Sequence, residues 1–153
     1  MIGFNHLGRH GRLGNQMFQY AGLRGIAAKH GYEFCIPASD FKDEWTDHQL
    51  FEAFKLTGLT NIATCPGPYV QEASFKFDQN LFDNMPDGHN VYAYLQSTKY
   101  FEHIEKEIRE DFQFKNNILD PCKQMIATVE KPIALHVRRG DYLVNSDNHP
   151  PCS

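Results

Sequence analysis

Apolar and polar positions in the first third of the chain change from a strand period to a helix period and back. A short apolar run predicts a strand at Ile2–Leu7, and the glycines that follow it indicate a turn. The next segment predicts a helix over Gln16–Lys29 that Gly31 ends. The run "YEFCIP" predicts a second strand, closed by Pro37. This order is typical of a βαβ unit with a right-handed crossover.

The middle of the chain carries a weaker pattern. We expect a short helix near Gln49–Leu56 and one or two extended segments in the aromatic stretch "PYVQEASFKFDQNLF". A strand at Asn90–Leu95 follows. Alternation of helices and strands favours an α/β fold, a Rossmann-like domain with a parallel sheet.

Two apolar stripes at helical spacing follow, and we interpret both as core faces. The first belongs to "STKYFEHIEKEIREDFQF", where Ser97 or Thr98 can cap a helix. In the second, Asp120 is the expected cap and Pro121 the first helical residue. The stripes consist of Phe101, Ile104, Ile108 and Phe112, and of Cys122, Met125, Ile126 and Val129.

The last ordered segment, "KPIALHVRRGDYL", predicts a strand. Ile133, Leu135 and Val137 alternate with residues of the opposite face, because strand side chains point alternately to the two sides. Ala134, His136 and Arg138 share that opposite face.

Composition places the chain among globular proteins. It has 153 residues, 41% of them hydrophobic and 22% charged, enough for one ordinary domain or for part of a larger protein. The net charge of −4 argues against a nucleic-acid partner. Neither a signal peptide nor an apolar run long enough to span a bilayer is visible, so we expect a cytoplasmic protein or one cut from a longer precursor.

The cysteines predict neither a metal site nor a redox motif. Cys35, Cys65, Cys122 and Cys152 form no C-x-x-C pair and have no zinc-like spacing with histidine. We expect reduced, mostly buried thiols, with a disulfide in an oxidising compartment as the alternative.

The first candidate for chemistry is "GRLGNQMFQYA", from Gly11 to Ala21, between the first strand and its helix. Ligands of open α/β sheets bind beyond the carboxyl ends of strands, and a helix N-terminus offers free amides to an anion. Gly14, Asn15 and Gln16 are therefore candidate binding residues. The glycines do not form G-x-G-x-x-G, which argues against a nicotinamide cofactor despite the acid at Glu33. A structural turn without a ligand remains the alternative.

The second candidate is the arginine pair at the end of the last strand. Arg138 and Arg139 can grip the oxygens of a diphosphate in pairs, and Gly140 leaves room for the ligand. Asp141 can orient one arginine, and His136 lies one strand step back on the face of Arg138. The alternatives are a surface ion pair and a satisfied, partly buried histidine. The adhesion tripeptide "RGD" is also present, at a strand end in a chain without a secretory signal.

Together these stretches resemble the signature blocks of the α-1,2-fucosyltransferases, glycosyltransferase family 11. The blocks "GRLGNQMFQYA", "YLQSTKYF" with "IREDFQF", and "LHVRRGDYL" occur in that family's order from Gly11 to Leu143. The resemblance implies the first half of a GT-B enzyme: an N-terminal α/β domain over residues 1–131 and, over 132–153, the first strand and motif of an incomplete nucleotide-binding domain.

The resemblance also implies an inverting transfer of L-fucose from GDP-L-fucose to the 2-hydroxyl of a terminal galactose. Arg138 is then the indispensable residue, with Arg139, His136, Gly140 and Asp141 at the donor pyrophosphate. Gly14, Asn15 and Gln16 are implied to face the same cleft from the first domain. GDP-L-fucose is a substrate, so no cofactor is expected, and arginines would stabilise the leaving group in place of a metal.

Other parts of the expected enzyme are less defined. Asp40, just past the second strand, is one candidate general base among others outside the chain. The family's catalytic unit extends past the arginine motif, so we expect the chain alone to be inactive or to bind donor poorly until a complementing C-terminal half is supplied. The alternative function is a non-catalytic module that binds a phosphate ligand or a partner. The sequence defines neither the acceptor glycan nor the oligomeric state.

Overall fold

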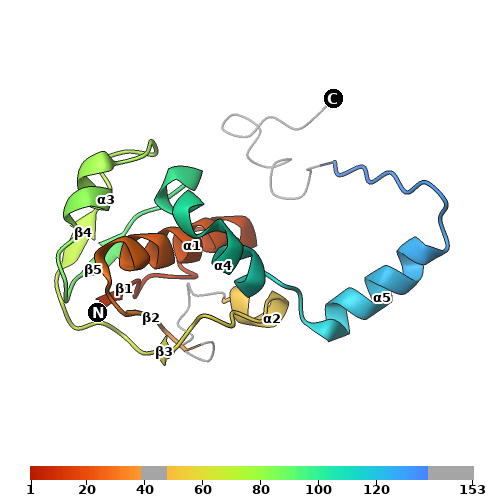
Figure 1. Ribbon diagram of the computed structural model, residues 1–153, viewed down its shortest axis with the longest axis horizontal. Helices are drawn as coiled ribbons and strands as arrows, with labels where there is room; N and C mark the ends of the chain where they lie inside the picture. The colour runs from red at the N-terminus through yellow and green to blue at the C-terminus, as the bar shows by residue number, and fades with distance from the viewer. Residues whose placement is uncertain (39–47, 138–153) are drawn as a thin grey trace. The chain divides into compact units, whose positions relative to one another are not determined.

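The computed structural model describes residues 1–38 and 48–137. It divides into two units, Met1–Ile118 and Leu119–Ser153, each described by itself. The first unit holds a sheet of five strands in the order β3-β2-β1-β5-β4 (Figure 1). The strands are β1 (Ile2–Gly3), β2 (Phe34–Ile36), β3 (Asn61–Ile62), β4 (Tyr69–Gln71) and β5 (Asn90–Tyr92).

All pairings in this sheet are parallel, which confirms the predicted α/β, Rossmann-like fold class. β1 lies at the centre, where Gly3 pairs with Cys35 of β2 on one side and Asn90 of β5 on the other. The chain fills the β2–β3 side first and then crosses to β4 and β5. The strand order therefore reverses between β1 and β5, which defines the switch point of the sheet.

Helix α1 (Leu13–His30) connects β1 to β2 and packs against both. It begins three residues before the predicted start, at Leu13, whose amide donates to the Gln49 side-chain oxygen at 2.8 Å. This cap comes from a distant part of the chain, so the local pattern does not reveal it. At the other end Gly31 adopts φ 68° and closes the helix as predicted.

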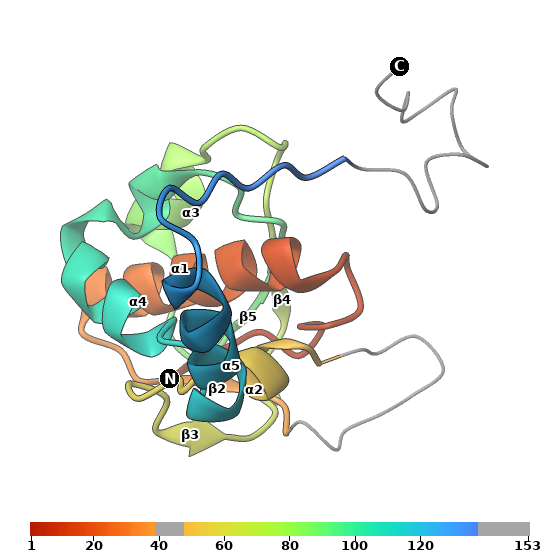
Figure 2. The same cartoon turned by 90° about the vertical axis from the view of Figure 1, so that its right-hand side faces the viewer.

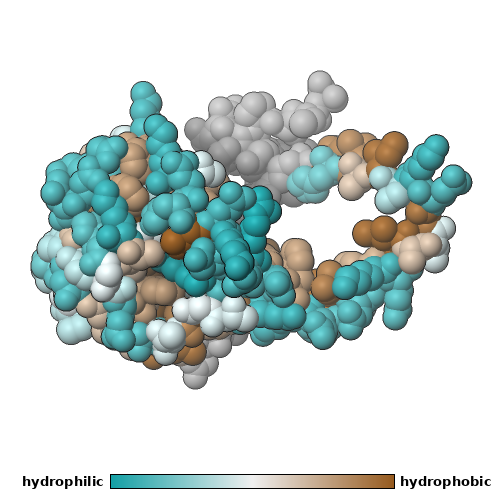
Figure 3. Space-filling model, in the orientation of Figure 1, coloured by the Kyte–Doolittle hydropathy of each residue, from teal (hydrophilic) through white to brown (hydrophobic). Residues whose placement is uncertain are grey.

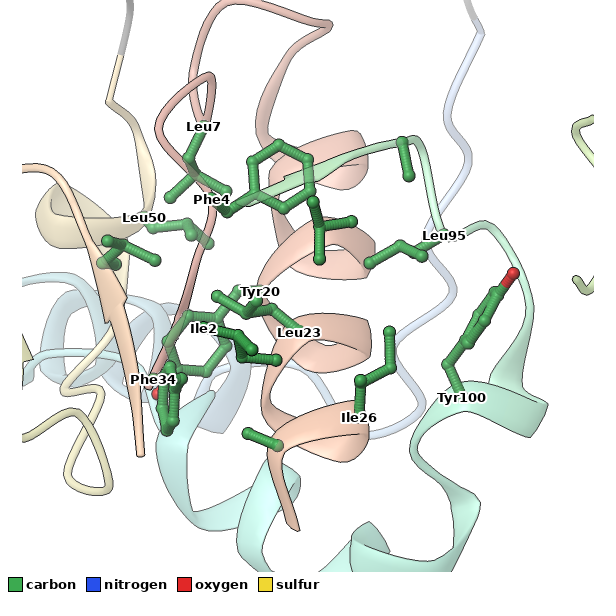
Figure 4. Packing of buried hydrophobic residues seen from close by; sticks show 14 of the residues in the cluster. Ile2, Phe4, Leu7, Tyr20, Leu23, Ile26, Phe34, Leu50, Leu95 and Tyr100 are labelled. Carbon is green, nitrogen blue, oxygen red and sulfur yellow. The ribbon is translucent and has the colours of Figure 1, made fainter. Parts of the chain in front are cut away.

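The core lies between α1 and the sheet, where strand and helix side chains interdigitate (Figure 4). Ile2 and Phe4 from the β1 region meet Leu23 and Ile26 of α1, and all four are fully buried. Burial of apolar surface on this scale provides the main driving force for the fold.

Two glycines of α1 allow another segment of the chain to approach the helix closely. Gly22 and Gly25 face the segment after β5. A Cβ atom on Gly22 would stand 2.7 Å from Leu95 Cβ, and one on Gly25 would overlap the backbone oxygen of Tyr100. These glycines therefore fix the path of residues 95–101 against α1.

The first predicted amphipathic helix is divided. Two short 3₁₀ turns, η1 (Thr98–Tyr100) and η2 (Glu102–Ile104), precede α4 (Glu105–Asp111), because Phe101 and Ile104 leave helical backbone geometry. No hydrogen bond from the Ser97 side chain caps η1. Ile108 is buried and the other stripe residues are half-buried, so the core interpretation of this stripe is confirmed in part. Both views show α4 beside α1 (Figures 1 and 2).

Three further helices complete the described chain: α2 (Leu50–Ala53), α3 (Gln79–Asn84) and α5 (Asn116–Ala127). α2 falls within the predicted segment. α5 starts four residues before the expected cap Asp120, so Pro121 lies inside the helix and the predicted cap is wrong. The core interpretation of its stripe is also wrong, because Met125 and Ile126 are exposed. Apolar side chains line one side of α5 and polar ones the other (Figure 3).

Residues 132–137 form no strand, in contrast to the prediction. Ile133 is 94% exposed and Leu135 87% exposed. A strand needs a paired neighbour, and the described residues of the second unit contain no other extended segment to supply one. No helix in the described parts of the chain has both the length and the apolar character needed to cross a bilayer.

Candidate functional site

Two loops flank the switch point at the carboxyl edge of the sheet. The first follows β1 and leads into α1, and the second follows β5 and leads into η1. Asn15 and Gln96 join them, because the Gln96 amide donates to the Asn15 side-chain oxygen at 2.6 Å. Open α/β sheets bind ligands at this position.

The loop after β1 turns twice at glycine. Gly8 and Gly11 have φ values of 86° and 88°, which side chains with a Cβ rarely adopt. His10 lies between these turns, and its backbone oxygen accepts a hydrogen bond from the buried Gln19 amide at 3.0 Å. The glycines and Gln19 together fix the backbone of His10 at the sheet edge.

A pocket of about 270 Å³ opens beside His10 at the ends of β4 and β5. The residues after β4 form one wall, and those at the end of β5 form the other. Its lining consists of His10, Gln71, Glu72, Ala73, Ser74, Phe75, Tyr92, Ala93 and Tyr94.

Glu72 is a buried carboxylate that holds the two walls together. One oxygen accepts from the backbone amides of Tyr94 and Leu95 at 3.0 and 3.2 Å. The other accepts from the Tyr100 hydroxyl at 2.9 Å. Leu95 has a positive φ of 52°, which is costly for a residue with a Cβ. The Glu72 carboxylate therefore offsets the strain that shapes the loop after β5.

Asp78 closes the other end of the wall after β4. Its carboxylate accepts from the Leu81 amide, as the cap of α3, and from the Ala73 amide, each at 3.0 Å. The amides of Leu81 and Ala73 lower the pKa of this carboxyl group, because they stabilise its charged form. The Asp78 amide in turn donates to the Tyr100 hydroxyl at 2.7 Å, and burial raises the pKa of that hydroxyl.

Aromatic rings gather around the pocket. The His10 ring lies 5.0 Å from the Tyr92 ring, edge to face, and 6.1 Å from the Tyr94 ring. The ring centroids of Tyr94 and Phe75 lie 5.3 Å apart, and the Phe75 side chain is 71% exposed. The pocket mouth therefore exposes aromatic surface to the solvent.

A second cavity of about 500 Å³ lies next to the first, around His6, Arg9 and Tyr69. The Asn5 amide donates to the Cys65 backbone oxygen at 2.8 Å, and the Cys65 amide donates to the Asn5 side chain at 2.9 Å. This reciprocal pair attaches the β1 loop to the segment that crosses the sheet edge.

The predicted binding residues of the first motif all lie in the first turn of α1. Gly14 faces open space, because a Cβ there would meet nothing within 4 Å. Asn15 is half-buried and bonded to Gln96. Gln16 is fully buried, and its side-chain oxygen accepts from the Gln49 amide at 2.9 Å. Gln16 therefore helps to position the loop, and the binding roles of Gly14, Asn15 and Gln16 all stay predictions.

The predicted residues of the second motif lie near or beyond the end of the described chain. His136 belongs to the second unit, where it is exposed and part of no helix or strand. Arg138, Arg139, Gly140 and Asp141 lie outside the described residues, as does the candidate base Asp40. Their roles stay predictions.

The pocket residues Glu72, Phe75 and Tyr94 were not among the sequence candidates. Glu72 and Phe75 stand in the aromatic stretch whose pattern is weak, and nothing local indicates that Glu72 is buried. His10 stands just before the first motif, between glycines, which is the one signal that could have identified it. Among residues 1–38 and 48–137, no three His, Cys, Asp or Glu side chains are arranged to hold a metal ion.

Comparison with known proteins identifies curated relatives that are named galactoside alpha-(1,2)-fucosyltransferases. The chain is 27% identical over 151 residues to galactoside alpha-(1,2)-fucosyltransferase 1 of Homo sapiens, covering 87% of this chain and 38% of that protein. It is 24% identical over 143 residues to galactoside alpha-(1,2)-fucosyltransferase 2 of Hylobates lar, covering 87% of this chain and 40% of that protein.

The chain thus spans about two fifths of the length of these curated relatives. No family model matches it. No solved structure matches it either. The resemblance seen in the motifs is confirmed: over 87% of its length the chain is homologous to the galactoside α-(1,2)-fucosyltransferases.

Proposed function

We propose that this chain is the acceptor-side half of an enzyme that transfers L-fucose from GDP-L-fucose to the 2-hydroxyl of a terminal galactose. The observation that carries the proposal is its homology, over 87% of the chain, to proteins named as galactoside α-(1,2)-fucosyltransferases. The pocket beside His10 supports it, because it lies at the carboxyl edge of the sheet next to the switch point, where parallel α/β sheets bind ligands.

The proposed reaction inverts the configuration at the fucosyl carbon and needs neither metal nor cofactor. Arg138 and Arg139 neutralise the charge that develops on GDP as the fucosyl bond breaks, as fixed guanidinium groups stabilise a leaving phosphate. His136, Gly140 and Asp141 support this anion site, and the first turn of α1 with Gly14, Asn15 and Gln16 faces the donor. In the GT-B arrangement the acceptor and donor domains meet at one cleft.

A complementing C-terminal half is part of the proposal. Ile133 and Leu135 are almost fully exposed, and they alternate with Ala134 and His136 as the residues of a strand do. A sheet supplied by further polypeptide would pair this segment and cover the apolar side of α5. A cytoplasmic location remains a prediction.

The direct test is incubation of the chain with labelled GDP-fucose and a β-galactoside, with and without the C-terminal half of a homologous fucosyltransferase. We expect labelled disaccharide only in the complemented reaction, and its loss on Arg138→Ala. Calorimetric titration of the chain alone with GDP should show no micromolar binding. GDP binding without product, alone or complemented, would instead favour a non-catalytic phosphate-binding module.

A further inference from the structure

The pocket beside His10 has the chemistry of a neutral-sugar site, and we propose that it binds the galactoside acceptor rather than the nucleotide. This inference rests on the proposed function and adds where its acceptor lies. The pocket is formed entirely by residues of the first unit, at the carboxyl ends of β4 and β5.

The charge of the pocket lining favours a neutral galactoside over an anionic nucleotide as its ligand. The described residues that line the pocket include no lysine or arginine, and their one carboxylate belongs to Glu72. A diphosphate there would lack a counter-charge and would approach a like charge, which is unfavourable at a partly buried site. The Glu72 oxygens accept three hydrogen bonds, from Tyr94, Leu95 and Tyr100, so Glu72 serves the pocket wall.

The remaining polar groups suit a polyol. Ser74 and Tyr94 provide hydroxyls, and Gln71 provides a carboxamide, all on residues that line the pocket. Such neutral groups both donate and accept hydrogen bonds, as sugar hydroxyls do.

The aromatic wall suits the apolar face of a pyranose. The rings of Phe75 and Tyr94 are neighbours, with their centroids 5.3 Å apart, and Phe75 is 71% exposed. Aromatic faces are electron-rich, so they attract the polarised C–H groups that galactose presents on one side of its ring.

Size agrees with a single sugar ring. The pocket volume of about 270 Å³ lies just below the range of roughly 300–1,000 Å³ for drug-sized ligands. A terminal galactose fits this scale, whereas an entire nucleotide sugar is larger.

The test is a titration of the ¹⁵N-labelled full chain with methyl β-D-galactoside, followed by amide chemical shifts. We expect saturable shifts at Ala73, Ser74, Phe75 and Tyr94. Phe75→Ala should weaken binding about three- to tenfold, the worth of one aromatic contact. The matched control is Ile62→Ala, an exposed apolar residue on β3 at the opposite sheet edge.

Several results would overturn the inference: no saturable shifts, shifts confined to other residues, equal weakening in both variants, or displacement of galactoside by GDP. The outcome is separable from that of the proposed function. Galactoside binding in this pocket without any transfer in the complemented assay would support the proposed acceptor site and contradict the proposed transferase activity. Transfer with an acceptor KM that Phe75→Ala leaves unchanged would support the transferase activity and contradict the placement of the acceptor in this pocket.

Discussion

The Tyr20 hydroxyl donates a 2.6 Å hydrogen bond to the carboxylate of Asp111, and the Asp111 side chain is completely buried. The same carboxylate pairs with the Arg24 guanidinium and accepts from the Gly58 amide at 2.6 Å. Asp111 thereby connects α1, α4 and the turn before β3. Burial raises the pKa of the Tyr20 hydroxyl, so Tyr20 is protonated and donates this hydrogen bond at neutral pH.

We predict that Asp111→Ala lowers the free energy of unfolding by about 3–5 kcal/mol, because it leaves the half-buried Arg24 guanidinium and the buried Tyr20 hydroxyl without their shared acceptor. Tyr20→Phe should cost less, about 1–3 kcal/mol, because it removes one donor and keeps the ring. Urea unfolding measures both. Glu110→Gln, a neighbouring exposed carboxylate, is the control. A loss below about 1 kcal/mol for Asp111→Ala would show that the network contributes little.

Substitution of two glycines of α1 by alanine should have different effects on the stability of the chain. Gly25→Ala should destabilise the chain by about 1–3 kcal/mol, because the new methyl group overlaps the Tyr100 backbone oxygen. Gly14→Ala should be neutral or stabilising by up to about 1 kcal/mol, since its Cβ meets open space within the helix. Thermal unfolding of the two variants decides. Equal effects would contradict the close approach of residues 95–101 to Gly25.

Protonation of Asp78 should account for part of the loss of folding stability at acidic pH. The Leu81 and Ala73 amides lower its folded pKa, so its contribution is fully present above the unfolded value of about 3.9 and is lost as the pH falls through the folded pKa. Asp78→Asn keeps a capping side chain but removes the titration. The drop in melting temperature between pH 7 and pH 2 should therefore be smaller in this variant. An unchanged drop would mean that Asp78 is not linked to folding.

Thiol reactivity should differ between the three described cysteines. Cys122 is exposed, whereas Cys35 and Cys65 are buried, and burial raises the pKa of the Cys35 thiol to about 11. In a Cys152→Ser background at pH 8, a disulfide reagent should label one thiol rapidly and the other two only after unfolding. Cys122→Ser should abolish the rapid phase. Rapid labelling that survives this change would contradict the burial of Cys35 and Cys65.

The sequence pattern predicted the elements whose signals are local. The βαβ unit over Ile2–Ile36 and the stop at Gly31 follow from periodicity and from the left-handed geometry that glycine allows. The start of α1 was missed because its cap, Gln49, comes from a distant segment. The break at Phe101 was missed because close packing of Tyr100 against Gly25 overrides an apolar stripe that reads as one helix.

The candidate site likewise contains features that the sequence predicted and features that depend on distant parts of the chain. The loop around Gly14 and Asn15 was predicted from its place after the first strand, and the structure brings it to the switch point through Gln96. The wall formed by Glu72 and Phe75 was not predicted, because burial of Glu72 depends on partners more than 20 residues away, at Tyr94 and Tyr100. The segment at Ile133 was predicted as a strand from alternation alone, which specifies a face but not a partner.

One measurement tests the central claim most directly: transfer of labelled fucose from GDP-fucose to methyl β-D-galactoside by the chain complemented with a fucosyltransferase C-terminal half. We predict a disaccharide in which fucose is attached to the 2-hydroxyl of galactose. The product should be absent when either polypeptide is omitted. A complemented complex that forms and binds GDP yet makes no such disaccharide would contradict the assignment.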